Sequence, residues 1–270
     1  RGSGPVVLCL HGVPDSARSF RSQLAGLDGY RVIAPMMRGY EPSSQPRDDD
    51  YGVHTLALDV LAWLDELGGE PCHLVGHDWG AIVAHVVALL APERLASLTT
   101  IAVPHPGRLA RELLRKRPSQ LLLSWYILFF QLRGVADSIV ERDDWAFLDM
   151  LWRRWSPSYR LPPDERQALK SVFAQPGVQR AALGYYRALP RTFTQPSFRR
   201  LLAQRVPVRT LAITGAEDGC MDTRLYDDLL HPRDFPAGLH VERIHGAGHF
   251  VHMERPDLVN ALLRAHFEQG

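Results

Sequence analysis

The stretch Gly76-His77-Asp78-Trp79-Gly80 decides the fold, because it joins two segments with different hydrophobic patterns. Residues 72–75 form a short apolar run typical of a buried strand, and residues 81–90 form a strongly apolar helical segment. Glycines on both sides of Asp78 permit a tight, strained turn that lifts this side chain to the edge of a sheet. The pattern is typical of a nucleophile elbow. An Asp that only caps the following helix is the alternative.

Apolar runs and helical patterns alternate in the same way on both sides of this stretch. Strands are predicted over residues 6–10, 31–34, 72–75, 95–103, 208–214 and 239–244. Amphipathic or apolar helices are predicted over residues 55–67, 81–90, 223–230 and 256–267. Strand, helix and strand in this order indicate βαβ units and therefore a parallel sheet.

About one hundred residues after Pro104 have a different pattern. Four of the six tryptophans fall here, and the segment has no alternating strand pattern. Proline-punctuated helices are predicted over residues 108–117, 121–131, 144–154, 164–173 and 178–188. The sequence therefore predicts an α/β class fold, with a mostly parallel central sheet flanked by helices and an inserted all-helical domain. The expected parts are 1–104 and 206–270 for the sheet domain and 105–205 for the insertion.

Composition excludes several classes of protein. The 270 residues are 46% hydrophobic and 23% charged, as in a globular chain with one large domain. A net charge of +1 gives no electrostatic reason to expect a nucleic-acid partner. The longest strongly apolar stretch, residues 121–130, is about half the ~20 residues of a membrane-spanning helix. We therefore expect no integral membrane association.

The cysteines and the first residues indicate the cellular compartment. Cys9, Cys72 and Cys220 are odd in number and lack a C-x-x-C pairing, which suits free thiols in a reducing compartment. The first residues have no apolar run of the kind found in signal peptides. The expected location is cytoplasmic.

Three residues in chain order suggest a catalytic triad. Asp78, Asp218 and His249 reproduce the order nucleophile, acid and base, and each follows a predicted strand. Asp218 as a turn former and His249 as an ordinary histidine are the alternatives. A metal site at His245, His249 and His252 fits the spacing, but glycines make this segment a loop and no nearby carboxylate or Cys completes a ligand set. We expect no metal and no cofactor.

A second feature follows the first predicted strand. His11-Gly-Val-Pro14 is positioned to supply one N–H of an oxyanion hole, and the residue after the nucleophile supplies the other. These donors would be the backbone amides of Val13 and Trp79. A simple strand-ending turn is the alternative for this segment.

With these motifs together, the sequence resembles the α/β-hydrolase-fold epoxide hydrolases along nearly its whole length. The resemblance rests on His-Gly-Val-Pro, Gly-His-Asp-Trp-Gly, Val-Pro-His-Pro and Gly-Ala-Gly-His-Phe, and the helical insertion corresponds to the family's cap domain. It implies two cap tyrosines over the nucleophile, at the positions of Tyr126 and Tyr186. Tyr185 could take the place of Tyr186, and aromatic residues of a cap helix are often only core.

An Asp nucleophile implies displacement at a saturated carbon, since the resulting ester is hydrolysable whereas a serine ether is not. The predicted reaction converts an apolar epoxide and water to a vicinal diol. Haloalkane dehalogenases share this nucleophile, but their common halide-binding Asn is replaced here by Val13. Haloacid dehalogenases carry Arg where Trp79 stands, and a non-catalytic binding protein would not need the triad. The cap's aromatic residues suit a contact between two copies, so a homodimer is one option.

Overall fold

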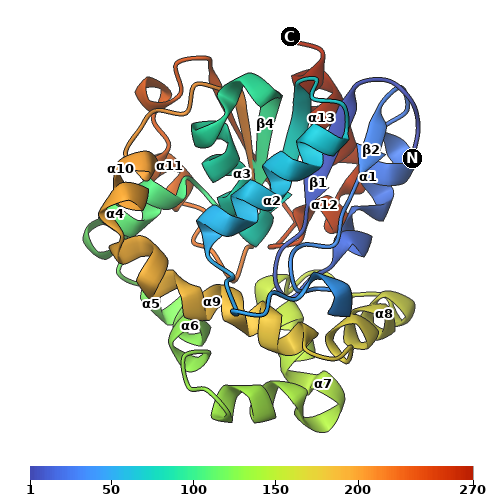
Figure 1. Ribbon diagram of the computed structural model, residues 1–270, viewed down its shortest axis with the longest axis vertical. Helices are drawn as coiled ribbons and strands as arrows, with labels where there is room; N and C mark the ends of the chain where they lie inside the picture. The colour runs from blue at the N-terminus through green and yellow to red at the C-terminus, as the bar shows by residue number, and fades with distance from the viewer. Residues whose placement is uncertain (270) are drawn as a thin grey trace.

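The computed structural model describes residues 1–269. The fold is built around one six-stranded sheet (Figure 1). Its strands are β1 (Val6–Leu10), β2 (Arg31–Ile33), β3 (Cys72–His77), β4 (Leu95–Ile101), β5 (Thr210–Gly215) and β6 (Leu239–Ile244). Their order across the sheet is β2-β1-β3-β4-β5-β6, and every pairing is parallel. All carboxyl ends therefore meet at one edge. The predicted fold class is confirmed.

Successive residues of β1 show why the buried strands are continuously apolar. Leu8 and Leu10 belong to one hydrophobic core, whereas Val7 and Cys9 belong to another. Neighbouring side chains of a strand point to opposite faces, so a sheet covered on both faces needs apolar residues at every position.

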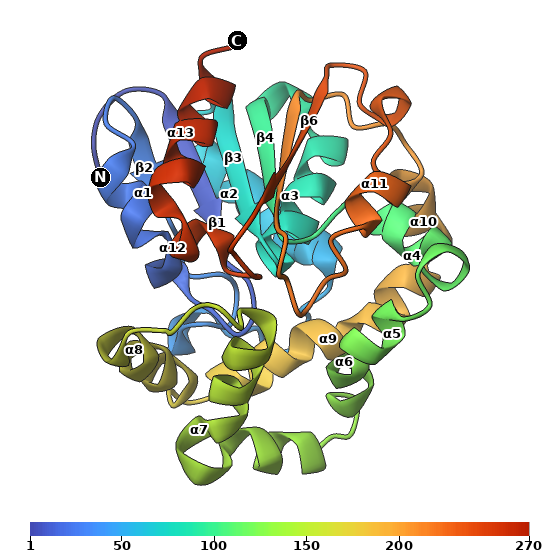
Figure 2. The ribbon, with the colours of Figure 1, turned by 180° about the vertical axis from the view of Figure 1, so that it is seen from behind.

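Helices cover both faces of the sheet (Figures 1 and 2). They are α1 (Arg21–Gly26), α2 (Val53–Glu66), α3 (Trp79–Leu90), α11 (Leu225–Leu229), α12 (Val251–Glu254) and α13 (Pro256–Phe267). Short 3-10 turns occur at Ala17–Phe20, Pro42–Ser44, Pro92–Arg94 and Pro232–Asp234. Helices α2 and α3 lie on one face, and α1 and α13 lie on the other.

All remaining helices lie between β4 and β5 in the chain, and we call this segment the cap. They are α4 (Pro106–Lys116), α5 (Gln120–Leu123), α6 (Trp125–Phe129), α7 (Val135–Trp155), α8 (Pro163–Phe173), α9 (Val178–Thr194) and α10 (Pro196–Leu202). Helices α5 to α9 lie beyond the carboxyl edge of the sheet (Figure 2). Within residues 1–269, none of the helices has the length and apolar character required to cross a membrane.

The cap departs from the sequence prediction at three helices, two of which differ in their continuity. The helix expected over 121–131 is two short helices, α5 and α6, because the chain turns at Ser124. Gln120, the first residue of α5, is anchored to the sheet domain through the carbonyl of Cys220. The helix expected over 144–154 belongs to the longer α7, whose backbone is non-helical at residues 142–145.

Helix α9 continues past the proline that was expected to end it. The helix was predicted to end at residue 188, yet it runs through Pro190 to Thr194. Pro190 has no N–H, so the carbonyl of Tyr186 one turn earlier lacks its usual helical partner. The side chain of Gln131 replaces this partner, because its Nε2 donates to the Tyr186 oxygen at 3.0 Å. A contact from the turn after α6 thus satisfies the interrupted helical turn.

Candidate active site

The turn between β3 and α3 holds Asp78 in a strained conformation. Asp78 has φ 51° and ψ −114°, a backbone conformation that L-residues rarely adopt. The flanking glycines make the turn sterically feasible: a Cβ at Gly76 would lie 2.2 Å from the oxygen of Gly80, and one at Gly80 would lie 2.0 Å from the oxygen of Leu10. The elbow therefore requires both glycines for close backbone packing.

The Asp78 carboxylate has two different oxygen environments. Oδ1 accepts a hydrogen bond from the backbone N–H of Val13 at 2.8 Å. Oδ2 lies 3.6 Å from Nε2 of His249. Gly12 permits this approach, since a Cβ there would lie 2.4 Å from both Cβ and Oδ1 of Asp78. Trp79, the other expected amide donor, is the buried first residue of α3.

The loops after β5 and β6 bring an acid and a base together. Nδ1 of His249 lies 2.9 Å from Oδ2 of Asp218 and donates to it, because an ionised carboxylate only accepts. Oδ1 of Asp218 accepts from the backbone N–H groups of Cys220 and Met221 at 2.7 and 2.9 Å. Three residues far apart in the chain, Asp78, Asp218 and His249, thus form one connected group.

Two carboxylates dominate the electrostatics of His249. Burial alone would lower the pKa of this fully buried imidazole, but the charge and hydrogen bond of Asp218 and then the nearby Asp78 carboxylate outweigh burial and raise the pKa to about 10. His249 is therefore a cation at neutral pH while both carboxylates are charged. It would become a base only when one of these charges is lost.

The cap places two tyrosines beside this group. The rings of Tyr126 and Tyr186 are 5.6 Å apart and nearly perpendicular, and Tyr186 also packs against Trp79 at 5.1 Å. Burial raises the pKa of both hydroxyls, and Asp78 contributes to each shift, so both remain protonated donors. Tyr185 faces elsewhere, because its hydroxyl donates to the carbonyl of Arg38 at 2.7 Å.

Sequence reasoning missed three supporting residues. The carbonyl of Trp155, at the end of α7, accepts from the backbone N–H groups of His249 and Gly219 at 3.0 and 3.1 Å. The buried thiol of Cys220 lies 3.3 Å from the hydroxyl of Tyr126. Glu254 accepts from the N–H of Gly248 at 2.8 Å. Backbone contacts such as those of Trp155 leave no signal in residue type, whereas Cys220, two residues after Asp218, could have been flagged by its position.

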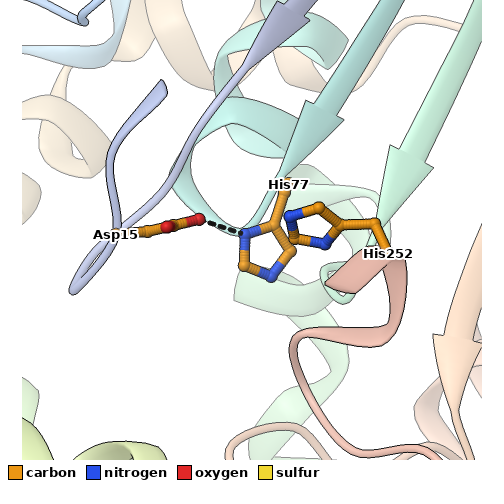
Figure 3. Close-up of side chains that lie close together, drawn as sticks. All are labelled: Asp15, His77 and His252. Atoms are coloured by element: carbon orange, nitrogen blue, oxygen red, sulfur yellow. Dashed lines mark ion pairs between the residues drawn. The ribbon is translucent and has the colours of Figure 1, made fainter. Parts of the chain in front are cut away.

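A second buried polar cluster lies next to the loop that carries His249. It is formed by Asp15, His77 and His252 (Figure 3). Oδ2 of Asp15 lies 3.3 Å from Nδ1 of His77. Nε2 of His77 donates to the carbonyl of His249 at 3.1 Å, because a carbonyl only accepts. The His77 and His252 rings pack at 4.4 Å. This cluster therefore supports the loop that carries His249.

Candidate metal ligands fall into two groups among the described residues. One is the cluster of Asp15, His77 and His252, and the other comprises Asp218, Cys220 and His249, with ligand atoms within 4.8 Å of one another in each. The combination of His245, His249 and His252 considered from the sequence does not form in residues 1–269, because exposed His245 belongs to neither group.

Comparisons with known proteins agree with this fold. The profile of the alpha/beta hydrolase fold family matches residues 5–256. The chain is 32% identical over 268 residues to the AB hydrolase superfamily protein YfhM of Bacillus subtilis, covering 97% of this chain and 90% of that one. It is 32% identical over 266 residues to epoxide hydrolase 2 of Caenorhabditis elegans, covering 96% and 73%. The solved structure of a Bacillus megaterium epoxide hydrolase with an inhibitor superposes with a TM-score of 0.86, at 26% identity and coverage of 99% and 95%.

The fold, the elbow and the profile match define the class of protein. The chain belongs to the alpha/beta hydrolase fold family. Within that family it is a member of the epoxide hydrolase group, as the resemblance noted in the sequence implies.

Proposed function

We propose that this member of the epoxide hydrolase group converts an apolar epoxide to a vicinal diol through a covalent ester on Asp78. The main support is the position of the Asp78 carboxylate at the elbow. Its Oδ2 lies 3.6 Å from Nε2 of His249, whose Nδ1 is hydrogen-bonded to Asp218. A carboxylate that displaces oxygen at a saturated carbon leaves an ester, which an activated water can hydrolyse. We propose residues 105–205 as the cap that covers this chemistry.

Ring opening would use the free oxygen of Asp78. Because Oδ1 is held by the N–H of Val13, Oδ2 is the oxygen positioned to attack an epoxide carbon. The carbon–oxygen bond of the ring breaks as the new carbon–Oδ2 bond forms. Tyr126 and Tyr186 hydrogen-bond the departing oxygen, and one of them transfers its proton to it. The product of this step is an ester that carries a neighbouring hydroxyl group.

Ester formation would also convert His249 into a base. The ester carries no charge, so His249 loses one of the two carboxylates that hold its pKa near 10. The imidazole then passes its proton to the tyrosinate left by ring opening and, now neutral, takes a proton from a water that attacks Cγ of Asp78. The developing oxyanion lies on Oδ1, against the amides of Val13 and Trp79.

Collapse of this intermediate would complete the cycle. The diol oxygen leaves with the proton held by His249, while Asp78 is released as a carboxylic acid. The proton of that acid passes to His249, which again becomes a cation between the two carboxylates. Water has then added across the ring, and every catalytic group regains its starting protonation state.

A paired turnover assay tests the proposal. Purified wild type and Asp78→Ala are incubated with styrene oxide, followed for diol, and with 1-bromobutane, followed for bromide. We expect diol from wild type, loss of diol in the variant, and no bromide from either protein. Bromide release without diol would overturn the proposal in favour of haloalkane dehalogenation.

A further inference from the structure

Cys220 connects the triad acid, the cap and one of the tyrosines. Its backbone N–H donates to Oδ1 of Asp218 at 2.7 Å, and its carbonyl accepts from Nε2 of Gln120 at 2.7 Å. Its Sγ lies 3.3 Å from the hydroxyl oxygen of Tyr126. The side chain is 1% exposed, so water does not compete for these contacts. All three polar groups of one residue are thus used within the site.

The thiol makes the two cap tyrosines chemically different. The hydroxyl of Tyr126 contacts the sulfur of Cys220, whereas the hydroxyl of Tyr186 has no hydrogen-bond partner within residues 1–269. Because Tyr186 is 2% exposed, its hydroxyl is a buried donor whose hydrogen is free to bond to a substrate oxygen. Tyr126 already has a neighbour, and the direction of its hydrogen depends on that neighbour.

The surroundings of Cys220 keep its proton on sulfur. Burial, and then the charges of Asp218 and Asp78, hold the pKa of the thiol well above its ordinary value. A thiolate would accept the Tyr126 hydrogen and turn it away from a substrate. A neutral thiol can instead donate its S–H to the oxygen of Tyr126, which leaves the hydroxyl hydrogen free.

On the basis of the proposed function, we propose that Cys220 positions Tyr126 for ring opening. Its S–H donates to the hydroxyl oxygen of Tyr126, so that the tyrosine hydrogen points towards the epoxide oxygen rather than towards the sulfur. A thiol suits this role because it is a weak donor, and Tyr126 can still adjust as the carbon–oxygen bond lengthens. Cys220 acts only through Tyr126 and does not contact substrate.

A double-mutant cycle tests this coupling. Single-turnover ester formation with styrene oxide is measured for Cys220→Ala, Tyr126→Phe and the double variant. Multiple-turnover hydrolysis in ¹⁸O-water reports which epoxide carbon is attacked, because the label enters Asp78 in one turnover and reaches the diol in the next. We expect Cys220→Ala to slow ester formation about three- to tenfold, the worth of one hydrogen bond. The same change should have less than about a 1.5-fold effect when Tyr126 is already Phe. The ratio of attack at the two carbons should shift only in the Tyr126 background.

Matched variants separate positioning from packing. Cys220→Ser keeps a donor and should retain most of the rate, whereas Cys220→Val fills the volume without a donor and should resemble Cys220→Ala. Cys72→Ala removes another buried thiol, at the opposite end of β3 from Asp78, and should leave the rate unchanged. Thermal unfolding of each variant confirms that the protein compared is folded.

Two results would overturn the inference: equal slowing in both backgrounds, or a Cys220→Ser variant as slow as Cys220→Val. These two results bear on the inference only if wild type forms diol and the Asp78→Ala variant does not. Absence of diol from wild type would instead refute the proposed function. The two failures are therefore distinguishable.

Discussion

At the scale of single residues, the site depends on how His249 is held between two carboxylates. The Asp218 oxygen is 2.9 Å from Nδ1 and fixes the ring, whereas the Asp78 oxygen is 3.6 Å from Nε2 and is not hydrogen-bonded to it. In the proposed cycle the nearer carboxylate would orient the imidazole throughout. The farther one would lose its charge when the ester forms, and this loss would turn the imidazole into a base.

Replacing His249 with Gln should separate the two halves of the reaction. Asp78 remains a carboxylate and both tyrosines remain, so ester formation continues. Without a base, ester hydrolysis should slow by about 10²–10⁴-fold. Intact-protein mass spectrometry after incubation with styrene oxide should then show a stable adduct of one substrate mass.

The position of that adduct provides the control. Asp78→Ala combined with His249→Gln should show no added mass, and wild type should show little because it turns over. An unmodified His249→Gln protein would contradict the assignment of hydrolysis, rather than attack, to this histidine.

At the scale of elements, helix α9 depends on a contact from the turn after α6 to place Tyr186. Pro190 removes one helical donor, and Gln131 supplies another to the Tyr186 oxygen at 3.0 Å. The same amide also donates to the carbonyl of Ile127 at 3.0 Å, so one side chain fixes both tyrosine-bearing helices. The spacing of the two cap tyrosines therefore depends on this bridge.

Gln131→Leu should destabilise the protein by about 1–3 kcal/mol, because the buried carbonyl of Tyr186 loses its donor. Pro190→Ala restores an N–H at the position that normally bonds this carbonyl. Its stabilising effect should therefore be larger in the Gln131→Leu background than in wild type. Urea unfolding of wild type, both single variants and the double variant measures this coupling, and strictly additive free energies would refute it.

The elements also show what the sequence could and could not predict. Strands β1 and β6 match their predicted ranges. The buried strand β1 carries a continuous apolar run, whereas β6 lies at the edge of the sheet and has a single buried residue. The grouping of Asp78, Asp218 and His249 could be predicted because a parallel sheet collects its strand ends at one edge. The break at Ser124 was missed. The thiol beside Tyr126 was also missed, because this contact joins segments 94 residues apart in the chain.

At the scale of the whole molecule, the site forms between the cap and the sheet domain and belongs to neither alone. The indole of Trp152 stacks on Phe250 at 3.4 Å, and its Nε1 donates to the carbonyl of Pro14 at 3.0 Å. The carbonyl of Trp155 holds the backbone of His249. One hydrophobic core includes residues from both parts. The charge state of the site is therefore linked to the stability of the whole fold.

This linkage predicts how stability changes with pH. The pKa of His249 is about 10 in the folded protein and near 6.5 when the chain is unfolded. Between these values the folded state binds one more proton than the unfolded state, so its stabilisation is complete below about pH 6.5 and is lost as the pH rises through about 10. Wild type should lose about 1.4 kcal/mol per pH unit in this window relative to His249→Gln, which cannot titrate there.

Urea unfolding of both proteins between pH 7 and 9 measures the effect. Their difference in unfolding free energy should shrink by about 2–3 kcal/mol across this range. Other groups that titrate in the window are common to both proteins and cancel in the difference. His245→Gln, on the same loop but exposed, should follow the wild-type curve. Parallel curves for wild type and His249→Gln would mean that His249 is not held as a cation between Asp78 and Asp218, and the charge-loss step that turns it into a base would then lack its starting state.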